Sequence, residues 1–209
     1  GISMIQVAEG ATVEVTNMLQ RMRELAVQGL NDTNALVDTN AIKTEYQQLG
    51  KEIQRISNNT EWNTKKISDG STSSAVYQVG ANSSQTISIA FSDIKALSGL
   101  TAVMSAADAA SAGSVADFAG TTLSNLDTAI NAIGTYRSTL GATINRLNYA
   151  ADNLQNVSTN TSASRSRIQD TDYAQATTEL ARTQIIQQAA TAMLAQANQQ
   201  PQSVLSLLQ

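Results

Sequence analysis

The most constraining feature of this sequence is an apolar repeat between residues 123 and 154. Its members are spaced by alternating steps of three and four residues, and they are Leu123, Leu126, Ile130, Ile133, Arg137, Leu140, Ile144, Leu147, Ala151 and Leu154. Only Arg137 interrupts the apolar series. This is the spacing of heptad a and d positions, and no proline breaks it. A helix of this length spans about 48 Å. The repeat therefore predicts a rod in which this helix lies against other helices.

Two upstream repeats predict helices that match this seam. The first follows the register Ile5, Ala8, Thr12, Val15, Leu19, Met22 and Ala26, and the second follows Ile42, Tyr46, Leu49, Ile53 and Ile56. The first has an apolar face about three positions in seven wide, which suits a helix with two neighbours. We expect helices at about 2–29, 39–57 and 115–164, the second capped by Asp38 or Thr39. With these partners, the long seam is expected to be buried mainly within the chain.

A β-hairpin is predicted at about 75–91. Two short alternating segments, at 76–79 and 87–91, flank the turn-forming residues 80–84. A lone hairpin is only marginally stable in water, so we expect it to lie against the rod. Residues 92–122 predict one helical turn near 93–100 and then a stretch of Ala, Ser and Gly with no clear pattern.

The C-terminal part predicts a fourth helical segment, from Tyr173 to about Asn198, with an interruption at Pro201. This tail either folds back on its own core or becomes buried on assembly. Residues 1–164 leave no evident groove for it, and exposed apolar residues are a liability in a monomer, so we favour assembly. The candidate assembly residues are Leu180, Ile185, Ile186, Met193, Val204, Leu205, Leu207 and Leu208.

Together these patterns predict a mainly α protein. The expected architecture is an elongated antiparallel helical bundle with a small β-hairpin region and a C-terminal helical extension. Residues 1–164 are expected to form the rod domain, and residues 165–209 the C-terminal helical segment.

Composition argues against several classes of function. The 209 residues include no Cys and no His, and the formal net charge is −4. The absence of Cys removes disulfides and thiolate chemistry, and the absence of His removes the commonest general base and metal ligand. No Lys/Arg cluster is present to neutralise the phosphates of a nucleic acid, and no apolar run is long enough for membrane insertion. We therefore predict no catalytic, cofactor-binding or metal-binding residue, and no enzyme.

Several long motifs resemble bacterial flagellin. They are the segments Gly1–Gly10, Leu19–Gln28, Val79–Asn82, Ser164–Ala174 and Leu194–Leu208. The resemblance implies a structural subunit of the flagellar filament that is exported by the flagellar secretion apparatus and polymerises outside the cell for motility. The family carries a helical segment before the motif at Gly1 and often has large variable domains where residues 92–120 lie. The resemblance therefore implies an N-terminally truncated chain without large outer domains, which we expect to remain monomeric or to associate weakly.

The resemblance also implies partners. These are other flagellin subunits, the flagellar export chaperone, the cap and junction proteins, and an innate immune receptor of the Toll-like class. The family's receptor-contact motif matches Gln20, Arg21, Leu25 and Glu45. Arg21 lies off the seam and can present its guanidinium, while Leu25 flanks the seam and is interpreted as filling a small pocket on the receptor. Alternatively, Arg21 and Glu45 only decorate the rod or pair with neighbouring helices.

Two other functions are consistent with these patterns. One is a hook–filament junction protein, which shares the terminal helices and the rod. The long matches at residues 19–28 and 164–174 favour flagellin over it. The other is a coiled-coil adaptor, which would form a discrete oligomer and would not need an apolar closing segment.

Overall fold

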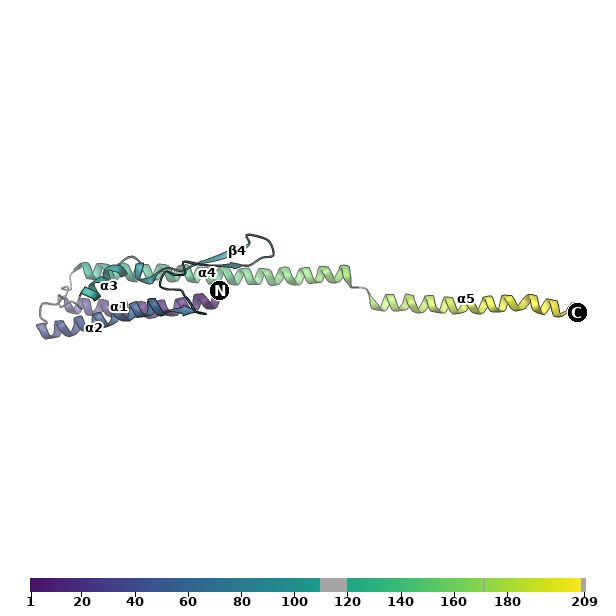
Figure 1. Ribbon diagram of the computed structural model, residues 1–209, viewed down its shortest axis with the longest axis horizontal. Helices are drawn as coiled ribbons and strands as arrows, with labels where there is room; N and C mark the ends of the chain where they lie inside the picture. Colours follow the sequence, from purple (N-terminus) through teal and green to yellow (C-terminus); the bar gives the residue numbers. More distant parts are fainter. Residues whose placement is uncertain (110–119, 171, 208–209) are drawn as a thin grey trace. The chain divides into compact units, whose positions relative to one another are not determined.

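The computed structural model describes residues 1–109, 120–170 and 172–207, and its contacts divide the chain into two units (Figure 1). The first unit is Gly1–Gln155 and the second is Asn156–Gln209. The helices are α1 (Ile2–Gly29), α2 (Leu36–Asn59), α3 (Leu100–Ala109), α4 (Gly120–Gln169) and α5 (Tyr173–Leu207), with a 3₁₀ turn η1 (Ile94–Ala96). The strands are β1 (Glu61–Trp62), β2 (Lys65–Lys66), β3 (Ser74–Gln78) and β4 (Thr86–Ala90). The predicted fold class is confirmed.

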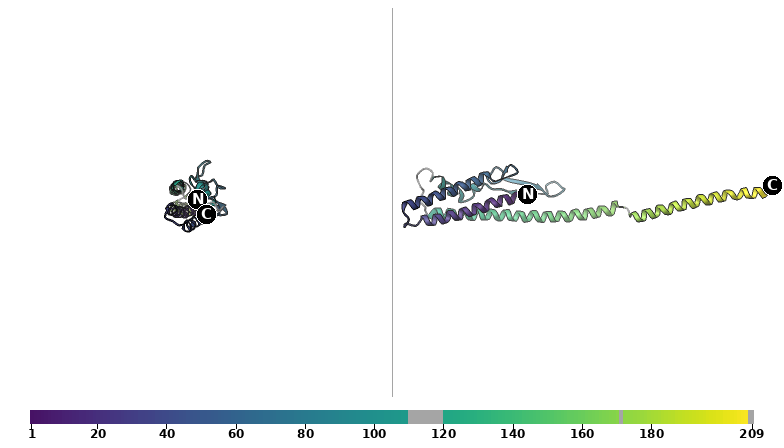
Figure 2. Two further views of the ribbon diagram at one scale, coloured as in Figure 1. Left: turned by 90° about the vertical axis from the view of Figure 1, so that its left-hand side faces the viewer. Right: turned by 90° about the horizontal axis from the view of Figure 1, so that it is seen from below.

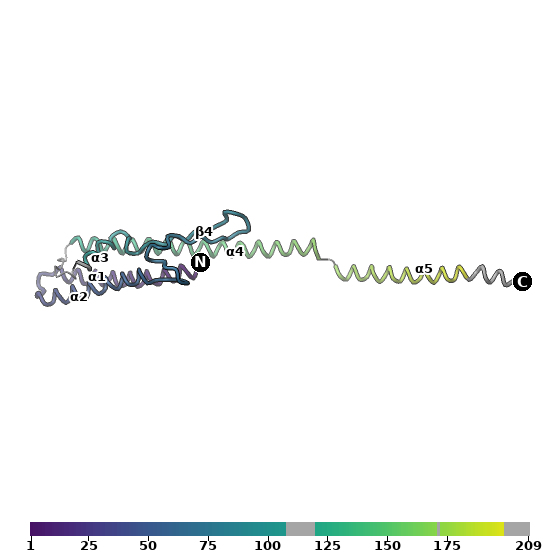
Figure 3. The backbone as a smooth tube through the Cα atoms, viewed as in Figure 1, coloured from purple at the N-terminus to yellow at the C-terminus, as the bar shows by residue number. Residues whose placement is uncertain are grey.

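In the first unit, α1 runs antiparallel to both α2 and α4. Figures 1 and 2 show α2 returning beside α1 from the turn that joins them, with α4 along the same bundle. Exposed ion pairs mark both contacts of α1. Arg21 bonds Glu45 on α2, and Arg23 bonds Asp127 on α4 at 2.7 Å. The chain path in Figure 3 places α3 at the α1–α2 turn end and β4 towards the other end.

Two hydrophobic clusters fill this bundle. The first includes Leu19, Met22, Ile53, Leu126 and Ile133, together with residues from α3 and η1. The second, at the hairpin end, includes Met4, Ile5, Ile67, Ile89, Phe91, Tyr136 and Leu140. The hairpin thus has the partner that a two-stranded sheet needs, because Ile87 and Ile89 of β4 are buried against α1 and α4.

One face of α4 is buried within the first unit as far as Leu147. The buried residues of α4 are Leu126, Ala129, Ile133, Tyr136, Leu140, Thr143 and Leu147. Leu154, seven residues beyond Leu147, is 42% exposed. Half of the predicted register is therefore confirmed: Leu126, Ile133, Leu140 and Leu147 are buried within the chain. The alternate positions are wrong by one residue, because Ala129, Tyr136 and Thr143 are buried in place of Ile130, Arg137 and Ile144, which are only half-buried. The end of the seam remains accessible.

Several element boundaries differ from the predictions. Helix α2 begins at Leu36, and its N-cap is Ala35, which makes no side-chain hydrogen bond. The predicted caps, Asp38 and Thr39, lie inside the helix instead. Helix α5 continues through Pro201 to Leu207. A proline lacks one backbone N–H, and here the loss of that hydrogen bond does not end the helix. The predicted start of the long helix near residue 115 lies outside the described residues, and α4 is described from Gly120.

Two elements were not predicted. Helix α3 comes from the Ala- and Ser-rich stretch, and it packs on α2 with Leu100, Val103 and Ala107 buried. The β1–β2 ribbon is formed by two-residue strands, which are too short to show an alternating pattern. None of the described helices combines the length and apolar content needed to cross a membrane.

Candidate interaction surfaces

The first candidate surface is centred on Arg21. Its Nε donates to Glu45 Oε1 on α2 at 2.8 Å, and its Nη1 donates to Glu24 Oε2, one turn along α1, at 3.0 Å. The hydrogen bond to Glu45, followed by that to Glu24, raises the pKa of Arg21. Since a guanidinium has five N–H donors, three remain for a partner. The side chains of Arg21 and Glu45 are about half exposed, so the pair lies at the surface.

Leu25 is placed differently from its predicted role. It is 2% exposed and belongs to the first core cluster, between α1 and its neighbours. The interpretation that it fills a pocket on a receptor is therefore wrong for the folded bundle, because the apolar face of α1 is wide enough to bury it. Gln20 is exposed on α1 beside Arg21. The structure thus brings together Gln20, Arg21 and Glu45 as an accessible polar surface and removes Leu25 from it.

The second candidate surface is α5. Every side chain that the structure describes in the second unit is exposed, and among them Leu180, Ile185, Ile186 and Met193 are 56–70% exposed. At about 100° per residue, Leu180, Ile185 and Ile186 are separated from one another by roughly 100–140° around the helix. A helix with apolar residues on all sides has no single core face. The exposed apolar side chains of α5 are therefore open to contact from more than one direction.

The structure does not describe the side chains of the remaining candidate tail residues. Val204, Leu205 and Leu207 lie in the last turns of α5, where only the backbone is described, and Leu208 lies outside the described residues. Leu194, which is 64% exposed, adds a further apolar side chain to α5 that the tail prediction did not include.

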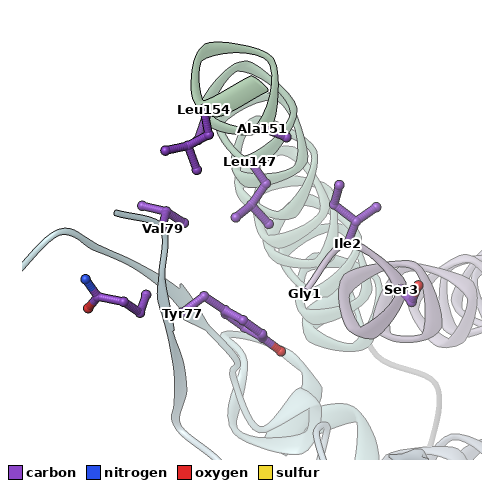
Figure 4. Close-up of a pocket in the computed structure, with 10 residues that line it drawn as sticks. Gly1, Ile2, Ser3, Tyr77, Val79, Leu147, Ala151 and Leu154 are labelled. Atoms are coloured by element: carbon purple, nitrogen blue, oxygen red, sulfur yellow. The ribbon is translucent and has the colours of Figure 1, made fainter. Parts of the chain in front are cut away.

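The third surface is an apolar groove of about 370 Å³ in the first unit (Figure 4). Figure 4 shows Leu147 and Leu154 on α4 facing the same space as Val79, Tyr77 and Ile2. The accessible end of the α4 seam is thus one wall of this groove. Because most of the lining is hydrocarbon, the groove is suited to binding apolar side chains and offers few polar groups for catalysis.

An exposed apolar tip at the α1–α2 turn was also missed from the sequence. Leu36 and Val37, in the first turn of α2, are each 77% exposed, and Val27 and Leu30 at the end of α1 are also exposed. The sequence contains a signal for this exposed tip, because the four apolar residues flank the polar turn at 31–34 and lie outside both heptad registers.

Comparison with known proteins places this architecture in a family. The model of the bacterial flagellin N-terminal helical region matches residues 1–73, and that of the C-terminal helical region matches residues 123–208. These two matches include more than half of the chain. The chain belongs to the bacterial flagellin family. It is 46% identical over its whole length to a flagellin of Halalkalibacterium halodurans, of which it covers 75%.

Other flagellins agree with this assignment. The chain is 40% identical to a Bacillus subtilis flagellin, with all of this chain and 77% of the relative aligned. The crystal structure of Bacillus cereus flagellin matches with a TM-score of 0.61 at 29% identity, covering 78% of this chain and 90% of that one. The flagellin-family chain is therefore a structural subunit of the bacterial flagellar filament, and it assembles with other copies. These matches do not favour the junction-protein alternative.

Proposed function

We propose that this flagellin-family chain joins the filament mainly through α5 and catalyses no reaction. The observation that supports this is the spread of exposed apolar side chains around α5. Burying one Ile or Leu side chain fully contributes about 1.5–3 kcal/mol. Ordering a flexible residue costs about 1–2 kcal/mol. The tail is therefore marginal alone and becomes ordered when neighbouring subunits surround it.

This role can be tested by polymerising a protein that contains residues 1–209. Ile186→Ser removes an apolar side chain that is 56% exposed in the second unit, and Gln188→Ser is a matched control on the same helix. We expect Ile186→Ser to raise the critical concentration, measured by sedimentation, by about tenfold or more. Gln188→Ser should change it by less than about threefold. Equal effects of the two variants would contradict a specific role for the apolar side chains.

We also propose that the chain is exported unfolded before it assembles. The sequence contains no cysteine, so no disulfide has to be broken for unfolding. An exposed apolar α5 also needs protection before assembly, which is consistent with an export chaperone that covers it and with cap and junction proteins that meet it at the filament end. The export chaperone should protect a segment of the tail that includes residues 180–194 from hydrogen exchange.

A second proposed role is recognition by a Toll-like innate immune receptor through Gln20, Arg21 and Glu45. The supporting observation is that Arg21 is half exposed and is held by two carboxylates with three N–H donors still available. Held side chains lose less conformational entropy on binding.

Receptor activation in reporter cells tests this second role. Arg55 is a matched control, since it is exposed and paired with Glu52 on α2, as Arg21 is paired with Glu24 on α1. We expect Arg21→Ala to weaken activation by about tenfold and Arg55→Ala to leave it within about twofold. Unchanged activation by Arg21→Ala would reject the role.

A further inference from the structure

A second cavity, of about 310 Å³, lies beside the β1–β2 ribbon in the first unit. The side chains that matter for its chemistry are Trp62, Asn63, Lys65, Thr72, Ser74 and Tyr77. They come from the ribbon, from the segment that leads into β3, and from β3 itself. This volume is at the lower end of the range for small-molecule sites. Most of the lining surface is polar, with the rings of Trp62 and Tyr77 among it.

The turn of the ribbon explains why these side chains converge. Asn63 and Thr64 have φ angles of 49° and 65°, which is the geometry of a tight two-residue hairpin turn with both central residues left-handed. This turn pairs Trp62 directly with Lys65 across the ribbon. Directly paired residues point to the same face of an antiparallel pair. Trp62 and the exposed Lys65 therefore lie on the same face of the ribbon, and both residues line the cavity.

The aromatic side chains of the cavity are held in place. Trp62 packs against the second core cluster, and the Tyr77 hydroxyl donates a hydrogen bond to Met4 Sδ at 3.3 Å. Fixed aromatic rings can receive an apolar ligand face without further loss of side-chain entropy.

The polar side chains of the cavity, in contrast, are available. Within the described part of the chain, the Asn63 amide and the Thr72 and Ser74 hydroxyls make no side-chain hydrogen bond, and Lys65 forms no ion pair. The cavity thus combines two partly buried aromatic rings with the half-buried hydroxyl of Thr72 and the solvent-exposed polar groups of Asn63, Ser74 and Lys65. Neutral hydroxyl-binding groups and a lysine complement a ligand that carries hydroxyls and one carboxylate.

We propose that this cavity binds one acidic sugar unit, such as a hexuronic acid in a cell-surface polysaccharide. The C–H face of the sugar ring lies on Trp62, since aliphatic C–H groups complement the negative face of an aromatic ring. The sugar hydroxyls exchange hydrogen bonds with Asn63, Thr72 and Ser74. The carboxylate faces Lys65. A filament built from such subunits would then carry one weak saccharide site per copy, and repetition would strengthen its attachment to a polysaccharide.

The fluorescence of Trp62 tests this proposal directly, because it is the only tryptophan in the sequence. Sodium glucuronate is titrated to about 50 mM against the purified chain, with sodium acetate, inorganic phosphate and glucose as separate titrations. We expect a saturable change in emission with glucuronate, at about millimolar affinity for a ligand of this size. Glucose should bind more weakly, and acetate and phosphate should give no saturable change.

Two exposed lysines provide the matched variants. Lys65→Gln should weaken glucuronate binding by about threefold to fivefold, as expected for an exposed charge pair, and should leave glucose binding unchanged. Lys51→Gln, on α2, should change neither. The proposal is overturned if glucuronate gives no saturable change, if acetate or phosphate reproduces it, or if Lys65→Gln and Lys51→Gln behave alike.

Discussion

The Nη2 atom of Arg137 lies 3.9 Å from Oε1 of Glu9, which pairs the one charged position of the α4 seam with α1. Arg137 is placed between Ile133 of the first core cluster and Leu140 of the second. Its Nε is buried and has no hydrogen-bond partner among the described residues. Arg137 thus lies close to the junction of the two apolar clusters with an incompletely satisfied guanidinium.

Replacing this arginine by an apolar residue should stabilise the bundle. A buried N–H without a partner costs about 1–3 kcal/mol, so we expect Arg137→Met to raise the free energy of unfolding by about 1 kcal/mol. Glu9→Gln should have little effect, because both side chains are more than one-third exposed and the contact is long. Urea unfolding followed by circular dichroism gives both values. A destabilised Arg137→Met would show that the guanidinium contributes more than it costs.

Two helical glycines should respond oppositely to alanine. A Cβ on Gly50 of α2 would lie 2.4 Å from the Cβ of Ala107 on α3, so Gly50→Ala should destabilise the chain by about 1–3 kcal/mol. A Cβ on Gly10 of α1 meets nothing within 4 Å, so Gly10→Ala should stabilise by about 0.5–1 kcal/mol. Thermal unfolding of the two variants compares them. Similar shifts would mean that α3 does not pack closely on α2.

Alkaline pH should destabilise the bundle through Tyr46. Burial raises the pKa of this phenol to about 12, from an ordinary value near 10. The neutral phenol is favoured in the folded chain, so this stability is fully present below pH 10 and is lost between about pH 10 and 12. The loss amounts to about 2–3 kcal/mol. Tyr46→Phe should flatten that part of the stability profile, measured by urea unfolding at several pH values, and an unchanged slope would exclude Tyr46 as its source.

The β1–β2 turn should be improved by glycine. Thr64 is β-branched and has a φ of 65°, a region that costs an L-residue about 1–2 kcal/mol. Thr64→Gly should therefore stabilise the chain by about 1 kcal/mol. Thr60→Gly is the control, because Thr60 has an ordinary φ of −69° and should lose stability instead. Thermal melts of both variants distinguish a local backbone effect from a general effect of glycine.

The bundle was predictable because its core depends on periodic apolar residues. Leu126, Ile133 and Leu140 follow a heptad spacing, and the structure buries all three. Helix α3 was not predictable in the same way. Its Ala and Ser residues show no periodic alternation of apolar and polar side chains. Only the close packing of Ala107 against Gly50 shows why a residue there must be small.

The candidate surfaces were predictable only in part. Motif resemblance located Arg21 and Glu45 but misplaced Leu25, because linear sequence does not show how far the core face of α1 extends. The cavity beside Trp62 depends on a turn formed by Asn63 and Thr64, which lacks the glycine that usually marks such turns. Its residues converge through the fold and are not grouped by any motif.

Assembly through α5 requires that its exposed apolar residues become buried when subunits join the filament. The chain has no native cysteine, so Ile185→Cys introduces a single thiol at a position that is 66% exposed in the second unit. Maleimide labelling of this thiol is compared in the free chain and in filaments of a protein that contains residues 1–209 with the same substitution. We predict rapid labelling of the free chain and at least about tenfold slower labelling in filaments. Labelling at the same rate in filaments would contradict assembly through α5.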